Sequence, residues 1–163
     1  MNIRFFIGVA YVAAIGILSN VVAIFIPRDR LREDKFPFKP FRWEREGRIY
    51  DRLAIRKWKS KVPDMSKILK FLLPKKVQKG VSSEDLCALI KETIVAEIVH
   101  VALSFLSLAI LFICPTVWGA VLFFLCLLFN LPFIVIQRYN RPQYITAAKR
   151  LRQREEKRRQ CLS

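Results

Sequence analysis

Long apolar runs alternate with strongly polar stretches along this chain. No charged residue occurs from Phe5 to Ile26, a run of 22 residues, or from Val101 to Gln137, a run of 37 residues. At roughly 1.5 Å per residue, a helix of the first length extends about 33 Å, which is enough to cross a hydrocarbon core of about 30 Å. The first run therefore predicts a membrane-spanning helix over residues 5–26.

A cleaved signal peptide is the alternative interpretation of the first run. The apolar region of a signal peptide is typically about 7–15 residues long and precedes a cleavage site with two small residues. The run here is longer, and no such site follows Ile26. We therefore favour an uncleaved membrane anchor.

The second apolar run is long enough for two passes. The segment 114–119 interrupts it, because Pro115 and Gly119 break helices and Trp118 suits a membrane interface. This predicts spans over residues 94–113 and 116–136, joined by a tight turn. The expected fold is an all-α integral membrane protein with three transmembrane helices, forming a single membrane domain over residues 1–163.

Charge predicts the orientation of these spans. Residues 28–79 contain 18 Lys and Arg against 7 Asp and Glu, residues 138–163 contain 9 against 2, and only Arg4 precedes the first span. Basic flanks favour the cytoplasmic side. We expect a multi-pass protein of the bacterial cell membrane with its N-terminus outside. The loop 28–82, the C-terminal tail 138–163 and the active face would then be cytoplasmic.

The cytoplasmic loop is expected to form amphipathic helices at the membrane interface. Over residues 47–59, Ile49, Tyr50, Leu53, Ala54 and Trp58 share one helical face, with basic residues on the flanks. A second helix is expected after Asp64, its N-cap, and Ser82 with Asp85 offers a capping box for the next helix. Basic amphipathic helices of this kind lie in the lipid headgroup layer.

Neither nucleic acid nor metal is an expected partner. The basic residues flank the spans, where membrane topology already requires them. The four cysteines are scattered without a CxxC spacing, so we expect free thiols. A single Glu-x-x-His motif with one histidine does not build a di-iron site.

Two polar seams are expected to meet between the second and third spans. Thr93, Glu97, His100, Ser104 and Ser107 are spaced 4, 3, 4 and 3 residues apart, which places them on one helix face. Facing lipid would be costly for the ionisable members, so this face should meet other helices. On the third span, Asn130, Gln137 and Arg141 share a face, with Arg138 beside it, and Pro142 should end that helix. An antiparallel hairpin places Asn130 between the levels of His100 and Ser104.

These seams offer acid–base and anion-binding chemistry. His100 is the only histidine, and Glu97 one turn earlier is expected to accept a hydrogen bond from its imidazole, as a general base requires. Packing through interhelical hydrogen bonds is the alternative role, which we favour for Ser104, Ser107 and Asn130. Further residues are candidates for holding phosphates, a developing oxyanion or other parts of the substrates: Lys57, Trp58, Lys59, Asp64, Thr93, Asn130, Gln137, Arg138, Asn140 and Arg141.

Several of these motifs resemble the glycosyl-4,4'-diaponeurosporenoate acyltransferase family of Gram-positive bacteria. The resemblance covers residues 27–145 and is carried by Glu92-Thr93, residues 96–100, residues 130–142, the trio Phe41, Glu44 and Gly47, and residues 55–59 with Asp64. It implies esterification of a membrane glycolipid's sugar hydroxyl with a fatty acyl group, as in staphyloxanthin-type carotenoid synthesis. Ile94, Val95 and Val101 depart from the residues expected of the carotenoid enzyme, so the acceptor stays open.

The expected function is therefore a membrane acyltransferase that acts on a lipid-linked sugar hydroxyl. His100 would be the general base and Glu97 its partner. We expect no bound cofactor, an acyl donor such as acyl-CoA as cosubstrate, and lipid as the partner, while the oligomeric state stays open. Two alternatives remain: another membrane-interface transferase such as a methyltransferase, or a non-catalytic adaptor whose basic loop binds anionic lipid.

The charge asymmetry makes a topological prediction. In a variant without its native cysteines, Asn2→Cys should react with an impermeant thiol reagent added outside the cell, because that end of the first span is expected outside. Ser60→Cys and Glu155→Cys should react only after the cells are opened. Labelling of Ser60→Cys in intact cells would overturn the orientation.

Overall fold

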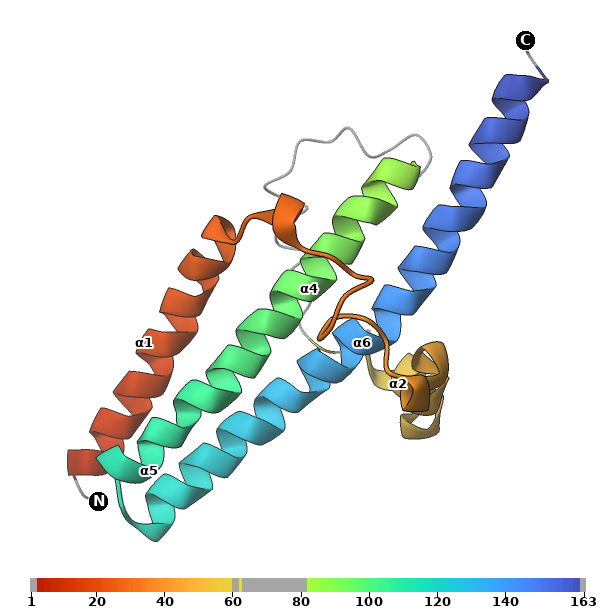
Figure 1. The fold of residues 1–163 in the computed structure, drawn as a ribbon. Coiled ribbons are helices and arrows are strands. Elements are labelled where there is room, and N and C mark those ends of the chain that lie inside the picture. The colour runs from red at the N-terminus through yellow and green to blue at the C-terminus, as the bar shows by residue number, and fades with distance from the viewer. Residues whose placement is uncertain (1–2, 60–61, 63–81, 162–163) are drawn as a thin grey trace. The chain divides into compact units, whose positions relative to one another are not determined.

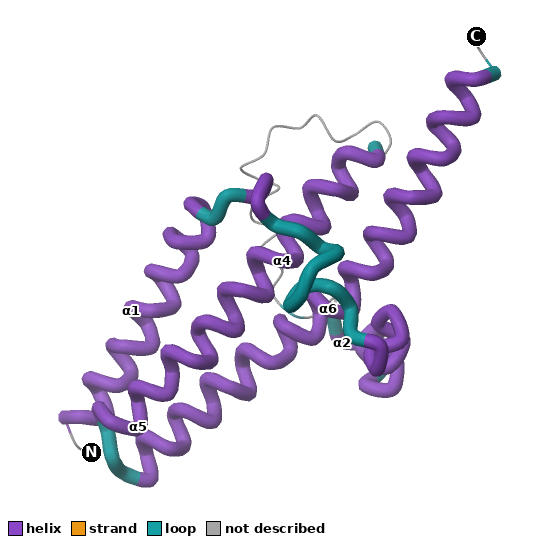
Figure 2. Tube along the Cα trace, viewed as in Figure 1, coloured by secondary structure: helices purple, strands orange, loops and turns teal. Residues whose placement is uncertain are grey.

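The described part of the chain is helical throughout. The structure, a computed structural model, describes residues 3–59, 62 and 82–161 (Figure 1). Within these residues Figure 2 shows helices and loops and no strand. The all-α prediction is therefore confirmed.

Eight helical elements follow one another along the described residues. They are α1 (Ile3–Phe25), η1 (Arg28–Arg30), η2 (Arg42–Leu53), α2 (Ile55–Trp58), α4 (Ser83–Leu106), η4 (Ser107–Ala109), α5 (Ile110–Ile113) and α6 (Val117–Gln160). Three stretches of the described residues are long and apolar enough to cross a membrane: Ile3–Phe25, Ser83–Ile113 and Val117–Gln160. The three predicted spans are confirmed in this sense, whereas their orientation stays a prediction.

The chain divides into two compact units. Unit 1 comprises Met1–Arg32 with Glu92–Gln137, and unit 2 comprises Glu33–Lys91 with Arg138–Ser163. The α4 and α6 helices contribute residues to both units. The prediction of a single membrane domain over residues 1–163 is untested by this division.

Unit 1 is a helix bundle of α1 and the parts of the other two apolar stretches between Glu92 and Gln137. The α1 helix lies against α5 (Figure 1). The Tyr11 hydroxyl donates to the Leu106 carbonyl at 3.0 Å. Gly8, the buried residue of α1, lies against Ile110 and Leu122. Most other side chains of α1 are exposed and apolar, which fits a helix surrounded by lipid.

The turn between α5 and α6 forms where the sequence predicts it. The Thr116 amide donates to the Cys114 carbonyl at 2.7 Å, which reverses the chain within a few residues. Gly119 lies so close to this turn that an added Cβ would stand 1.9 Å from the Cys114 oxygen. A glycine is therefore required where α6 begins.

The ends of the helices confirm one prediction and correct another. The capping box forms, since the Ser82 amide donates to Asp85 and the Asp85 amide donates to the Ser82 hydroxyl, at 2.9 and 3.1 Å. The prediction that Pro142 ends the last helix is wrong, because α6 continues through it to Gln160. A proline inside a helix removes one amide donor and frees one carbonyl, but the helix on both sides of Pro142 is continuous.

The prediction of one continuous amphipathic helix over residues 47–59 is wrong. The segment forms η2 and α2, separated by Ala54 at φ 49°, and Gly47 within η2 has φ 89°. Glu44, Gly47 and Tyr50 are buried at every third position, which matches the three residues per turn of a 3₁₀ helix. The second expected helix, after Asp64, lies outside the described residues.

The turn at Gly119 yields a stability prediction. Gly119→Ala should lower the free energy of unfolding by about 1–3 kcal/mol, because the new methyl group must displace the Cys114 carbonyl. Gly16→Ala is the matched control, since a Cβ added there would meet nothing within 4 Å. Thermal unfolding in detergent measures both, and equal melting temperatures for the two variants would contradict this account of the turn.

Candidate functional site

The first cluster lies in unit 1 and joins His100 on α4 to Asn130 on α6. Imidazole Nδ1 lies 2.8 Å from the Asn130 side-chain oxygen, and Asn130 is buried. The Phe133 ring stacks on the imidazole, with ring centres 4.4 Å apart. This confirms the predicted antiparallel register and makes Asn130 an interhelical hydrogen-bonding residue. We call His100, Asn130 and Phe133 the imidazole cluster.

The contacts of Asn130 determine which imidazole nitrogen carries the proton. Its amide nitrogen donates to the Cys126 carbonyl at 2.8 Å, so its oxygen turns toward the imidazole. An amide oxygen only accepts, hence Nδ1 of His100 must donate. In the neutral ring this leaves the lone pair on Nε2, which is the atom that accepts a proton in general-base catalysis.

The structure gives the imidazole a different partner from the expected Glu97. Within the described residues, the hydrogen bond of the His100 ring is to Asn130. Glu97 and Thr93 lie on the same helix, and both are buried and engaged in contacts. The sequence predicted a partner one turn away on the same helix, whereas Asn130 on the neighbouring helix bonds to the imidazole.

The two serines of the seam bond within their own helix. The Ser104 hydroxyl donates to the His100 carbonyl at 2.8 Å, and the Ser107 hydroxyl donates to the Ser104 carbonyl at 2.7 Å. The expectation of interhelical hydrogen bonds is therefore wrong for these two residues. Such bonds to the preceding turn let a hydroxyl be buried without a partner on another helix.

The second cluster lies in unit 2 and is built around Glu44. Arg138 on α6 donates from Nε and Nη2 to the two oxygens of Glu44, the second at 3.0 Å. The Tyr50 hydroxyl also donates to Glu44, and the Phe41 amide does so at 2.6 Å. Glu44 is 1% exposed. We call Glu44, Tyr50 and Arg138 the carboxylate cluster, which anchors η2 on α6.

The contacts of the carboxylate cluster shift the pKa of Glu44 and the pKa of Tyr50. Burial opposes ionisation of Glu44, but the hydrogen bonds from Arg138, Tyr50 and the Phe41 amide outweigh it, so the pKa of Glu44 lies below its usual value. Burial and the neighbouring Glu44 carboxylate raise the pKa of Tyr50. Glu44 is therefore an anion and Tyr50 a neutral donor at neutral pH.

Further contacts connect the residues before and after η2 to α6. Arg141 is 1% exposed, and its Nη1 donates to the Phe38 carbonyl at 2.8 Å. Lys59 donates to the Asn140 side chain at 3.1 Å and lies over the Tyr139 ring. A small hollow is lined by Phe38, Pro40, Glu44, Arg138, Arg141 and Pro142. Both predicted anion-binding arginines thus have protein partners.

The remaining predicted site residues are dispersed. Lys57 is exposed, the Trp58 indole donates to the Leu53 carbonyl at 2.9 Å, and Gln137 is half-buried. Asp64 lies outside the described residues. Over residues 3–59 and 82–161, no group of three or more His, Cys, Asp or Glu side chains is placed to hold a metal ion. Their roles in substrate binding stay predictions.

Sequence reasoning missed Glu44 and Tyr50 as site residues. Glu44 is 94 positions from its partner Arg138, and nothing in local periodicity connects them. The available signal was the three-residue spacing of Phe41, Glu44 and Gly47 within a basic stretch. Gly47 is required because an added Cβ would lie 3.2 Å from the Tyr139 carbonyl oxygen, in a conformation that favours glycine.

Comparisons with known proteins converge on one family. Residues 34–150, which include both clusters, match the family described as glycosyl-4,4'-diaponeurosporenoate acyltransferase. Proteins of that name from Staphylococcus aureus strains MRSA252 and bovine RF122 / ET3-1 are each 29% identical over 133 residues, covering 81% of this chain and 80% of theirs. The protein from strain USA300 is 28% identical over the same length. No solved structure matches the chain.

The carboxylate cluster predicts acid sensitivity. Because the folded pKa of Glu44 is lowered, the ion pair stabilises the protein fully above the ordinary glutamate pKa of 4.5, and this stabilisation is lost as the pH falls through the lowered value. Glu44→Gln should cost about 3–5 kcal/mol at neutral pH, since it leaves the Arg138 charge buried without its counter-ion. The melting temperature of this variant should also fall less than that of the wild type as the pH is lowered.

Thermal unfolding in detergent between about pH 7 and pH 3 measures this effect. Tyr50→Phe is the matched control, because it removes one donor and no charge, and should cost about 1 kcal/mol. A Glu44→Gln protein that melts like the wild type at every pH would show that the ion pair does not anchor η2.

Proposed function

Because the chain belongs to the glycosyl-4,4'-diaponeurosporenoate acyltransferase family, we propose that it esterifies a sugar hydroxyl of a membrane glycolipid with a fatty acyl group. The family and its relatives identify the chain as an acyltransferase. This excludes the two alternatives, a methyltransferase and a non-catalytic adaptor. A glycosylated carotenoid, which the names of the relatives specify, is the acceptor we favour. The acyl donor is a cosubstrate such as acyl-CoA.

The hydrogen bond between His100 and Asn130 carries the chemical part of this proposal. Acyl transfer to an alcohol needs a base that removes the hydroxyl proton as the oxygen attacks. Asn130 keeps the Nδ1 proton in place, so Nε2 of His100 holds a lone pair at the same ring orientation in every turnover. Phe133 restricts the ring further by stacking on it.

The proposed step is a substitution at the acyl carbonyl carbon. The sugar oxygen forms a bond to that carbon while Nε2 of His100 takes the hydroxyl proton. The bond between the acyl carbon and the leaving group of the donor then breaks, and the proton on Nε2 passes to that leaving group. Asn130 stabilises the transient imidazolium by accepting from Nδ1, as an orienting partner does in a catalytic triad.

The surroundings of the base support a lipid acceptor. His100 and Asn130 lie in two of the three candidate membrane spans, among mainly apolar side chains. We place the active face at the cytoplasmic side of the cell membrane, because the basic loop and tail favour that side. Gln137, Arg138, Asn140, Arg141, Lys57, Trp58 and Lys59 remain the proposed contacts of the donor or of the transition state.

Two substitutions test the base and its partner. His100→Ala should lower turnover by about 10²-fold or more, the usual contribution of a positioned general base. Asn130→Ala should lower it less, because the imidazole survives but its tautomer is no longer fixed. Acyl transfer from a labelled acyl-CoA to a glycosylated carotenoid in nanodiscs, followed by mass spectrometry, measures both.

Ser107→Ala is the matched control. Its hydroxyl is buried on the same polar seam and bonds to the backbone, so its removal should leave turnover close to that of the wild type. A folded His100→Ala protein with near-normal turnover would remove the general-base role.

A further inference from the structure

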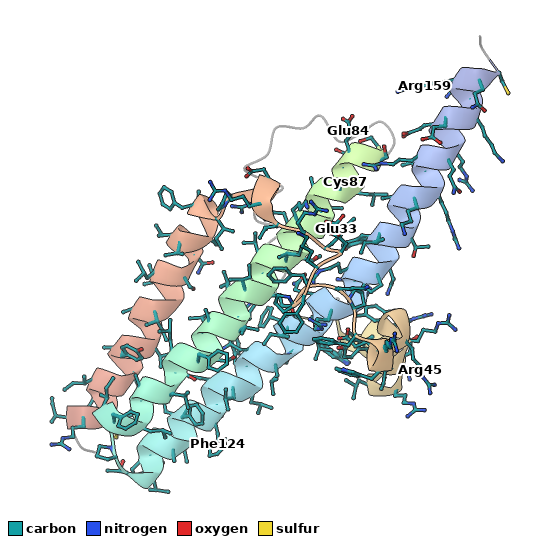
Figure 3. The ribbon with its side chains drawn as sticks, in the orientation of Figure 1. Glu33, Arg45, Glu84, Cys87, Phe124 and Arg159 are labelled. Atoms are coloured by element: carbon teal, nitrogen blue, oxygen red, sulfur yellow. The ribbon has the colours of Figure 1, made fainter. Side chains whose placement is uncertain are left out.

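Three arginines form an exposed row on η2. Arg42, Arg45 and Arg48 occur at every third position and are all exposed, and Figure 3 labels Arg45 on this element. Within the part of the chain that the structure describes, none of the three takes part in a hydrogen bond or an ion pair. We call Arg42, Arg45 and Arg48 the arginine ridge.

The opposite side of η2 is fixed to α6, so the arginine ridge has a rigid base. Glu44, Gly47 and Tyr50 alternate with the three arginines along the chain and are buried. Glu44 pairs with Arg138, and Gly47 lies against the Tyr139 backbone. A side chain on a fixed backbone loses less conformational freedom when it binds a ligand, which favours binding.

The backbone of Arg45 is strained. Its φ is 48°, in the left-handed region that residues other than glycine seldom adopt. Such strain persists where the surrounding structure enforces it, and it concentrates at sites of binding and catalysis. A glycine at position 45 would relieve it, yet the chain carries an arginine there.

The two acidic side chains of η2 that the structure describes pair with arginines outside the arginine ridge. Glu44 is engaged by Arg138, and Asp51 is engaged by Arg56 at 3.1 Å. The arginines that the sequence predicts for anion binding, Arg138 and Arg141, are mostly or fully buried and hold protein groups. The guanidinium groups of the ridge are therefore better placed to meet an external anion than those of Arg138 and Arg141.

We propose that the arginine ridge binds the phosphate groups of the acyl donor. This inference rests on the proposed function, because it assigns a substrate class to the same reaction. Planar guanidinium groups bind phosphate through two parallel hydrogen bonds, which lysine does not reproduce. The phosphate belongs either to a soluble acyl thioester such as acyl-CoA or to a phospholipid that donates its acyl chain, and both present the same anion.

Two triple variants of the full-length protein test the ridge. One carries Arg42→Gln, Arg45→Gln and Arg48→Gln. The matched control carries Arg150→Gln, Arg154→Gln and Arg158→Gln, which removes the same charge from exposed positions of α6. Binding of CoA to detergent-purified protein by calorimetry is the first readout, and it needs no turnover. The KM and kcat for acyl-CoA are the second.

The ridge variant should bind CoA at least about tenfold more weakly than wild type, with a matching rise in KM and little change in kcat. The control should stay near wild type. Replacing the three arginines by lysine should restore only part of the affinity. A ridge variant that binds and turns over like the control overturns the proposal.

Nanodiscs distinguish the two sources of phosphate. If wild type binds no CoA, acyl transfer should require phosphatidylglycerol rather than a neutral glycolipid bilayer, and the ridge variant should need a higher fraction of phosphatidylglycerol to reach the same rate. Activity in both bilayers together with no CoA binding overturns the proposal. CoA binding that depends on the ridge in a protein without acyl transfer would contradict the proposed function alone.

Discussion

A polar group that is buried away from water destabilises a protein unless it is hydrogen-bonded, and this constraint shapes both clusters of the molecule. Within the described residues, no buried side-chain nitrogen or oxygen lacks a hydrogen-bond partner. In the apolar bundle this leaves few solutions: serines turn to their own helix, and His100 and Asn130 turn to each other. These hydrogen bonds orient the polar side chains of the bundle.

The same constraint gives the two clusters different tasks. In unit 1 it fixes the tautomer of a neutral imidazole, which is what a general base needs. In unit 2 it uses a buried carboxylate and a guanidinium to attach a short, irregular segment to α6, while the arginines of that segment remain exposed. One cluster orients the imidazole of His100, and the other holds a segment whose own arginines are exposed.

The sequence predicted what depends on local pattern. Uninterrupted apolar runs predicted the three spans, Pro115 and Gly119 predicted the turn, and Ser82 predicted the start of α4. An antiparallel hairpin that turns near residue 116 was enough to predict Asn130 between the levels of His100 and Ser104, where it bonds to His100.

What depends on tertiary contact was missed. The geometry of η2 comes from contacts of Glu44 and Gly47 with residues more than ninety positions away, so helical periodicity suggested a regular helix instead. A proline lacks one donor, which predicts a helix end at Pro142, but helix α6 extends through it to Gln160. Spacing along one helix predicted Glu97 as the partner of His100, whereas burial selected Asn130.

The tautomer of His100 is the most direct test of this account. The chain has a single histidine, so ¹⁵N-histidine labelling gives one pair of imidazole nitrogen signals without any assignment problem. In nanodiscs at neutral pH, solid-state NMR should show a protonated Nδ1 and an unprotonated Nε2, and Asn130→Ala should convert this into a mixture of tautomers. A proton on Nε2 in the resting wild-type protein would contradict the account.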